Sequence, residues 1–163
     1  MFSHEHKTFI LERLTKAFES DLSTLVDSAQ SAYEAATHAE SRADNKYDTR
    51  GLEASYLAGA QAQRAAEIRK VLGLCTQLVI RSYTPDDAVG ISALVEIESE
   101  SGHQWVFLVP FAGGQSIEID GQKVSIVSSA SPLGGELMGR TRGEDVIVEM
   151  RGRKVEWQIL KIL

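Results

Sequence analysis

Apolar residues recur at steps of three and four along the first part of the chain. They change from leucine and phenylalanine to alanine, in the order Leu11, Leu14, Phe18, Leu22, Leu25, Ala29, Ala32, Ala36 and Ala39. A second stripe of similar period contains Leu57, Ala65, Ile68, Leu72, Cys75 and Val79. Such a stripe is typical of a helix that lies along another helix. We therefore predict two long helices, over Thr8–Arg42 and Thr49–Ile80.

The segment between the two stripes is short and polar, so it should only reverse the chain direction. Two long helices joined in this way form an antiparallel hairpin. The tip of the hairpin, residues 43–53, carries three carboxylates, from Asp44, Asp48 and Glu53. Exposed carboxylates alone hold Mg²⁺ weakly, but they can complete a second metal site where another ion is already bound. The alternative is that these acids only solubilise the tip or cap the second helix.

After Pro85 the apolar pattern changes from a helical period to the alternation of strands. Pro85 and the polar residues around it, 81–88, should end the second helix and form a linker. Five strands are predicted, over Ile91–Glu98, Trp105–Pro110, Lys123–Ser128, Asp145–Met150 and Lys154–Ile162, with a short helical turn within Ser131–Gly139. We expect an α+β chain: an antiparallel coiled-coil arm over residues 1–81 and a twisted antiparallel β domain over residues 82–163.

The charge of the chain argues against a generally basic nucleic-acid binder. The net charge is −6, and residues 82–163 carry −5 of it. We therefore expect no sequence-specific DNA binding. The single cysteine, Cys75, cannot form an intramolecular disulfide, which favours a reducing cytoplasm; a buried packing role is favoured over a reactive thiol. No apolar run approaches the roughly 20 residues of a membrane-spanning helix.

The sequence offers little self-contained catalytic chemistry. His4 and His6 lie in an expected frayed end, and no histidine has a familiar zinc spacing. The glycine pairs 113–114 and 134–135 lack the flanking residues of a phosphate-binding loop and are interpreted as turns. A nucleophile elbow of the Gly-x-Ser-x-Gly type is also missing. We therefore predict that the chain is not an enzyme by itself.

Two motifs, one in each half of the chain, carry a family resemblance. Ser131-Pro-Leu-Gly-Gly-Glu-Leu-Met-Gly continues through Gly143-Glu-Asp-Val, with Glu144-Asp145 at a Gly-Asp step. Glu53-Ala-Ser-Tyr56 opens the second predicted helix. Both resemble motifs of the Gre family (GreA/GreB), the transcript-cleavage factors of bacterial RNA polymerase. The resemblance implies an N-terminal coiled-coil arm and a C-terminal FKBP-like β domain.

The resemblance also implies a function. The C-terminal domain would dock at the rim of the polymerase secondary channel, through Ser131, Pro132, Leu133 and Gly134. The arm would then carry its acidic tip to the catalytic Mg²⁺, where the factor stimulates the polymerase's own cleavage of backtracked RNA near the 3′ end. The tip carboxylates would be Asp48, Glu53 and Asp44, of which Asp48 and Glu53 would share the polymerase Mg²⁺. The basic residues that would contact RNA or polymerase are Arg42, Lys46, Arg50 and Arg64. The chain would hold no cofactor of its own and would act as a monomer.

The tip departs from the family pattern, Asp-Leu-(Ser/Lys)-Glu-Asn-Ala-Glu-Tyr. Counted back from Tyr56, the family's Asp falls on Thr49 and its first Glu on Leu52. Here the acids are Asp48 and Glu53, five residues apart instead of three. A second hypothesis is therefore a regulator that occupies the secondary channel without stimulating cleavage.

Two further hypotheses come from other classes of protein. A peptidyl-prolyl isomerase would need a concave aromatic pocket. Its candidate residues, Trp105, Phe107, Phe111 and Trp157, are expected in the core because they belong to strands. A general coiled-coil interaction module is the remaining alternative.

Overall fold

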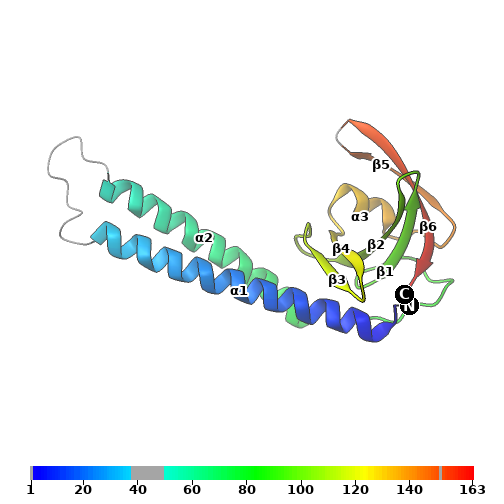
Figure 1. Ribbon diagram of the computed structural model, residues 1–163, viewed down its shortest axis with the longest axis horizontal. Helices are drawn as coiled ribbons and strands as arrows, with labels where there is room; N and C mark the ends of the chain where they lie inside the picture. The colour runs from blue at the N-terminus through cyan, green and yellow to red at the C-terminus, as the bar shows by residue number, and fades with distance from the viewer. Residues whose placement is uncertain (1, 38–49, 151) are drawn as a thin grey trace. The chain divides into compact units, whose positions relative to one another are not determined.

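The computed structural model describes residues 2–37, 50–150 and 152–163, and the side chains of residues 35–37, 50–55 and 150 lie outside this description (Figure 1). The chain divides into two compact units. One unit contains Thr15–Thr76, and the other combines Met1–Leu14 with Gln77–Leu163.

Two long helices, α1 (His4–Thr37) and α2 (Arg50–Gln77), confirm the helical interpretation of the two stripes. They lie side by side and antiparallel in the unit Thr15–Thr76 (Figure 1). Side chains buried in this unit come from both helices and belong to the predicted stripes: Phe18, Ala32, Ala65 and Cys75. The Cys75 thiol is 4% exposed and hydrogen-bonds to Thr15 of α1, so the two helices are in contact there. The buried thiol has a raised pKa because burial disfavours its charged form.

The prediction of the second apolar stripe is wrong at its two ends, because both end residues are exposed. Leu57, in the second turn of α2, is 51% exposed, and Val79 is 73% exposed. Val79 lies beyond the helix because α2 ends at Gln77, three residues before the predicted end. The helical period therefore does not determine which way the Val79 side chain points. The first helix also differs from its prediction, because it begins at His4 instead of Thr8.

The second unit contains a six-stranded sheet and one short helix. The strands are β1 (Leu94–Ser99), β2 (Gly102–Val109), β3 (Ser116–Ile119), β4 (Gln122–Ser128), β5 (Asp145–Met150) and β6 (Arg153–Ile162), and the helix is α3 (Pro132–Leu137). Their order in the sheet is β3-β4-β2-β1-β6-β5. Strands β2 and β4 are parallel, and the other neighbours are antiparallel. The sheet is therefore mixed, and the purely antiparallel prediction is corrected.

The strand missing from the prediction, β3, explains the parallel pair. After β2 the chain forms β3 at the sheet edge and returns through β4, which lies between β3 and β2. Ile117 and Ile119 are buried while Glu118 between them is exposed, which is the alternation of a strand. Asp120 and Gly121 follow with φ angles of 51° and 74°, as a two-residue hairpin turn requires.

The two faces of the sheet bury different sets of side chains. One face packs with α3 around a single core of Val89, Ala93, Val95, Ile97, Val106, Leu108, Leu133, Leu137, Val146, Val148, Trp157, Ile159 and Ile162. Alternation along β2 places Trp105 and Phe107 on the opposite face. There the ring of Phe2 meets the ring of Trp105 edge-on, with centroids 4.8 Å apart.

The start of the chain is therefore ordered, and the prediction of a frayed end is wrong. Phe2 is buried, and His6 lies 3.4 Å from a carboxylate oxygen of Asp120. Lys7 is only 1% exposed. Its ammonium donates hydrogen bonds to the backbone oxygens of Arg81 and of Leu163, the latter at 2.9 Å. These non-local contacts hold the first turns of α1 in the unit that contains the sheet.

Within the described ranges, none of the helices combines the length and the apolar character needed to cross a membrane.

Candidate docking site and arm tip

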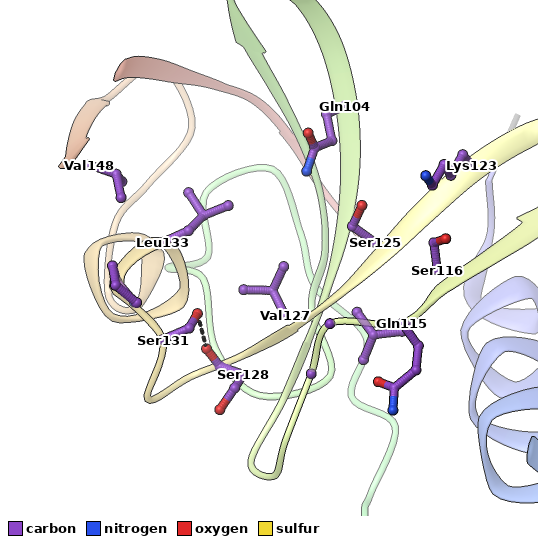
Figure 2. Close-up of a pocket in the computed structure, with 14 residues that line it drawn as sticks. Gln104, Gln115, Ser116, Lys123, Ser125, Val127, Ser128, Ser131, Leu133 and Val148 are labelled. Atoms are coloured by element: carbon purple, nitrogen blue, oxygen red, sulfur yellow. Dashed lines mark hydrogen bonds between the residues drawn. The ribbon is translucent and has the colours of Figure 1, made fainter. Parts of the chain in front are cut away.

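A cavity of about 510 Å³ lies between α3 and the sheet (Figure 2). Its apolar lining comes from Val127, Pro132, Leu133 and Val148, and Ile126 also borders it, although its side chain is buried on the opposite face of β4. Its polar lining comes from Gln104, Gln115, Ser116, Lys123, Ser125, Ser128 and Ser131, and Gly113 and Gly114 complete it. A cavity of this volume is large enough to take a small ligand or side chains of a partner protein.

The apolar side of the cavity depends on how α3 begins. Ser131 is the N-cap: its hydroxyl oxygen accepts a hydrogen bond from the Gly134 amide at 3.2 Å. The same hydroxyl donates to the Ser128 carbonyl at 2.7 Å. Pro132 follows at the first helical position, where its fixed φ suits the helix. Together these features place Leu133 against the core and beside the cavity.

Gly134 lets α3 approach β4. A β carbon at position 134 would overlap the carbonyl oxygen of Ser128. Gly113 has a similar role in the loop before β3, because a β carbon there would lie 2.5 Å from the Ile126 carbonyl oxygen. The cavity is therefore bounded on two sides by backbone that only glycine allows to come so close.

The polar side of the cavity continues the core face of the sheet. Along β4, Val124 and Ile126 are buried on one face, so Lys123 and Ser125 lie on the other. Ser125 pairs with Ser116 of β3 in the antiparallel register. Gln104 precedes Val106 by two residues on β2 and so shares the core face. Figure 2 shows these polar side chains on one side of the cavity and Leu133 and Val148 on the other.

The cavity is partly apolar and has one positive charge, so it suits a group that is partly apolar and acidic. Lys123 is the one charged residue among the fourteen that line it. The cavity therefore suits an apolar side chain that lies next to a negative charge.

The residues predicted for docking fall at this cavity. Ser131, Pro132 and Leu133 line it, whereas Gly134 is buried against Ser128 and does not. Gly134 and Gly135 lie within α3, so their interpretation as a turn is corrected. The prediction missed the polar lining of the sheet. Gln104 offered a signal, because it is a polar residue that directly precedes Val106 and Leu108 on the same face of β2.

The structure describes only a small part of the residues predicted for the tip and the arm contacts. Arg42, Asp44, Lys46 and Asp48 lie outside the described residues. Arg50 and Glu53 belong to the first turn of α2, but their side chains also lie outside the description. Arg64, farther along α2, is exposed. Elsewhere in the described part of the chain, no group of three or more His, Cys, Asp or Glu side chains is placed to hold a metal ion.

The aromatic residues considered for an isomerase pocket lie elsewhere. Phe107, Phe111 and Trp157 are buried, as predicted, although Phe111 lies two residues beyond the end of β2 and is not a strand residue. Trp105 is half-buried and packs on Phe2. The cavity beside α3 is lined by none of these four residues. Its lining therefore does not match the aromatic pocket that a prolyl isomerase would need.

Comparisons with known proteins found similar solved structures and one family model. Crystal structures of GreA factor homolog 1 (Gfh1) from Thermus thermophilus and Thermus aquaticus are 23% and 22% identical to the chain, with TM-scores of 0.38 each. The first covers 94% of both chains; the second covers 93% of this chain and 92% of the other. A GreA/GreB elongation factor from Nitrosomonas europaea is 20% identical, with a TM-score of 0.35, over 50% of this chain and 64% of the other.

A search of curated proteins found no match. The family model described as "Transcription elongation factor, GreA/GreB, C-term" matches residues 84–163. This range contains all six strands, α3 and the whole lining of the cavity. Residues 84–163 are therefore a C-terminal domain of the GreA/GreB transcription elongation factor family.

Proposed function

We propose that this chain is a transcription elongation factor that binds bacterial RNA polymerase in its secondary channel and stimulates cleavage of backtracked RNA. The observation that carries the proposal is the combination of a GreA/GreB C-terminal domain with a hairpin of two long helices. At 1.5 Å per residue, α1 and α2 are about 50 Å and about 40 Å long. Helices of this length can carry residues at their far end to a deep site.

The cavity beside α3 is the proposed docking site on the polymerase. Members of the GreA/GreB family bind bacterial RNA polymerase. Ser131, Pro132 and Leu133 form the apolar side of the site, and Gln104 and Lys123 form its polar side. A partner side chain in the cavity would bury apolar area against Leu133, while Lys123 would attract a neighbouring carboxylate. Removal of apolar area from water would supply most of the affinity, on the order of 25 cal/mol per Å².

The tip carboxylates Asp44, Asp48 and Glu53 are the proposed working groups. Their oxygen atoms are the ligands that Mg²⁺ prefers. Asp48 and Glu53 would hold a Mg²⁺ ion jointly with the polymerase active site. That ion would activate water for hydrolysis of the RNA backbone. Arg50, with Arg42, Lys46 and Arg64, would contact the RNA phosphates or the polymerase. The chain itself would then be a stimulating factor and not an enzyme, acting as a cytoplasmic monomer without sequence-specific contact to DNA.

A second candidate function is a regulator that occupies the channel without stimulating cleavage. The observation that favours it is the spacing of the acids, with Asp48 and Glu53 five residues apart. The family pattern places its acids three residues apart, so the carboxylates of this chain reach different positions. Binding to polymerase does not depend on this difference, but delivery of a metal ligand does.

The test uses a stalled, backtracked RNA polymerase complex with Mg²⁺. The purified chain is added, and the release of short RNA fragments from the 3′ end is followed. Cleavage above the polymerase's own rate, lost in the Asp48→Ala and Glu53→Ala variants, supports the proposal. The variants must still bind polymerase, which excludes a loss of docking as the cause. Binding by the wild-type chain without any cleavage would select the regulator instead.

A further inference from the structure

The strand β5 is an open edge of the sheet. It lies at one end of the strand order, and Figure 1 shows it with β6 as an outer hairpin. Proteins protect such edges with very short strands, with charged side chains, especially lysine, and with proline or bulges. The opposite edge strand, β3, has four residues, but β5 has six and contains neither lysine nor proline. The charged side chains of β5 are both acidic, so its backbone groups offer a place where a strand of complementary charge can pair.

The outer face of β5 carries an apolar residue between two acids. Val146 and Val148 are buried toward the core, so alternation places Asp145, Ile147 and Glu149 on the other face. Ile147 is 57% exposed, although isoleucine is among the residues most often buried. This face therefore presents a carboxylate, an apolar side chain and a second carboxylate at successive positions along one strand.

The neighbouring strand adds to the acidic character of this face. Glu156 of β6 pairs with Ile147 in the register, and Gln158 pairs with Asp145. Lys154 pairs with Glu149 and is the one basic residue among these register partners. The face around Ile147 is therefore negative, which matches the excess of acids in this half of the chain.

These charges decide which partner fits the edge. If two copies of this chain paired antiparallel through β5 about Ile147, Asp145 of each copy would lie opposite Glu149 of the other. Like charges placed opposite each other in a sheet are destabilising. A nucleic-acid backbone would be repelled for the same reason. The partner that complements this edge is a protein segment with positive charges.

We propose that β5 binds an extended protein segment in which a basic, an apolar and a basic residue occupy alternate positions. The segment would extend the sheet by main-chain hydrogen bonds, and its side chains would give the specificity. Its apolar residue packs on Ile147, and its two basic residues face Asp145 and Glu149. The two intervening residues face the core side beside Val146 and Val148, so they are small or apolar. This surface is separate from the docking cavity and goes beyond the proposed function.

The test titrates the full-length chain with the peptide Ac-Lys-Val-Ile-Val-Lys-NH2 and follows its backbone amide NMR signals. The proposal expects saturable shifts centred on β5, which weaken at high salt because the charges are exposed. The matched control peptide, Ac-Glu-Val-Ile-Val-Glu-NH2, should give at least about a tenfold weaker response. Equal binding of both peptides, or shifts centred on the cavity beside α3, would overturn the proposal.

Variants on the two edges make the test specific. Ile147→Lys and Glu149→Lys change exposed positions, so the fold should be retained, and an unchanged far-UV spectrum checks this. Each should weaken binding of the basic peptide by about tenfold or more, while Glu118→Lys on the opposite edge strand β3 should not. A dimer of the wild-type chain in sedimentation that Ile147→Lys dissociates would contradict the proposal, because the edge would then bind a second copy. The peptide titration does not involve RNA polymerase, so this proposal and the proposed function can fail independently.

Discussion

Gly134 of α3 lies so close to the carbonyl oxygen of Ser128 that a β carbon at position 134 would overlap it. The carbonyl belongs to the end of β4 and accepts hydrogen bonds from the Ser131 amide and hydroxyl. It therefore cannot shift without losing the cap of α3. This contact sets the separation between the helix and the sheet, and with it the shape of the cavity.

Gly134→Ala should destabilise the C-terminal domain by about 1–3 kcal/mol, the usual cost of overpacking, even though alanine favours helix. Urea denaturation measures this change, and both tryptophans, Trp105 and Trp157, lie in this unit and report its unfolding. Gly135→Ala is the matched control. Its β carbon would lie 3.7 Å from the Ser129 carbonyl oxygen, an ordinary contact. It should leave stability unchanged or raise it by up to about 1 kcal/mol. Equal effects of the two variants would contradict this account.

Lys7 should make the stability of the same unit depend on pH. Burial lowers the pKa of its ammonium to about 8, from an ordinary value of 10.5. Between these values the unfolded chain binds more protons than the folded chain, so stability rises with pH. We expect a rise of about 1.5 kcal/mol from pH 8 to pH 9.5, on the scale of about 1.4 kcal/mol per pKa unit.

The control for this prediction is Lys7→Met, which keeps an unbranched side chain but cannot titrate. The difference in unfolding free energy between wild type and variant isolates the contribution of Lys7. The range stops below pH 10 because burial raises the pKa of the Tyr83 hydroxyl above its usual 10.0, and stability therefore falls when unfolded tyrosine ionises. Identical pH profiles for the two proteins would show that the ammonium is not held in a buried site.

Cys75 should react slowly with a thiol reagent such as Ellman's reagent. Its thiol is buried, its pKa is raised by that burial, and the reactive thiolate is correspondingly scarce. We expect labelling of the native chain to be on the order of a hundredfold slower than labelling of the urea-unfolded chain. Comparable rates in the two states would instead support a reactive cysteine and a helical pair that opens readily.

The parts of the fold that depend on local patterns were predictable from the sequence. The period of three and four residues indicated α1 and α2. The alternation of Asp145–Met150, with Gly143 before it and Gly152 after it, gave β5 its observed bounds. The strand β3 was missed because four residues give only two apolar positions. The Asp120-Gly121 turn was recognised, and such a turn needs a strand on each side.

The parts that depend on distant contacts were not predictable in this way. A lysine is usually exposed, so the sequence does not indicate that Lys7 is buried. Its hydrogen bonds to the carbonyls of Arg81 and Leu163 explain the burial. The cavity itself was not predicted, but three of its lining residues, Ser131, Pro132 and Leu133, belong to the segment in which a short helical turn was expected. Its polar side needed the parallel register of β2 and β4, which no local pattern specifies.

Competition for RNA polymerase tests the central claim most directly. A labelled secondary-channel factor is bound to polymerase, and its displacement by this chain is measured by fluorescence anisotropy. The account predicts displacement by the wild-type chain and about tenfold weaker displacement by Ser125→Phe, whose ring would fill the cavity. Asp86→Phe, at an exposed turn outside the cavity, should compete like the wild type. Absence of competition by the wild-type chain, or equal competition by all three proteins, would contradict docking through this cavity.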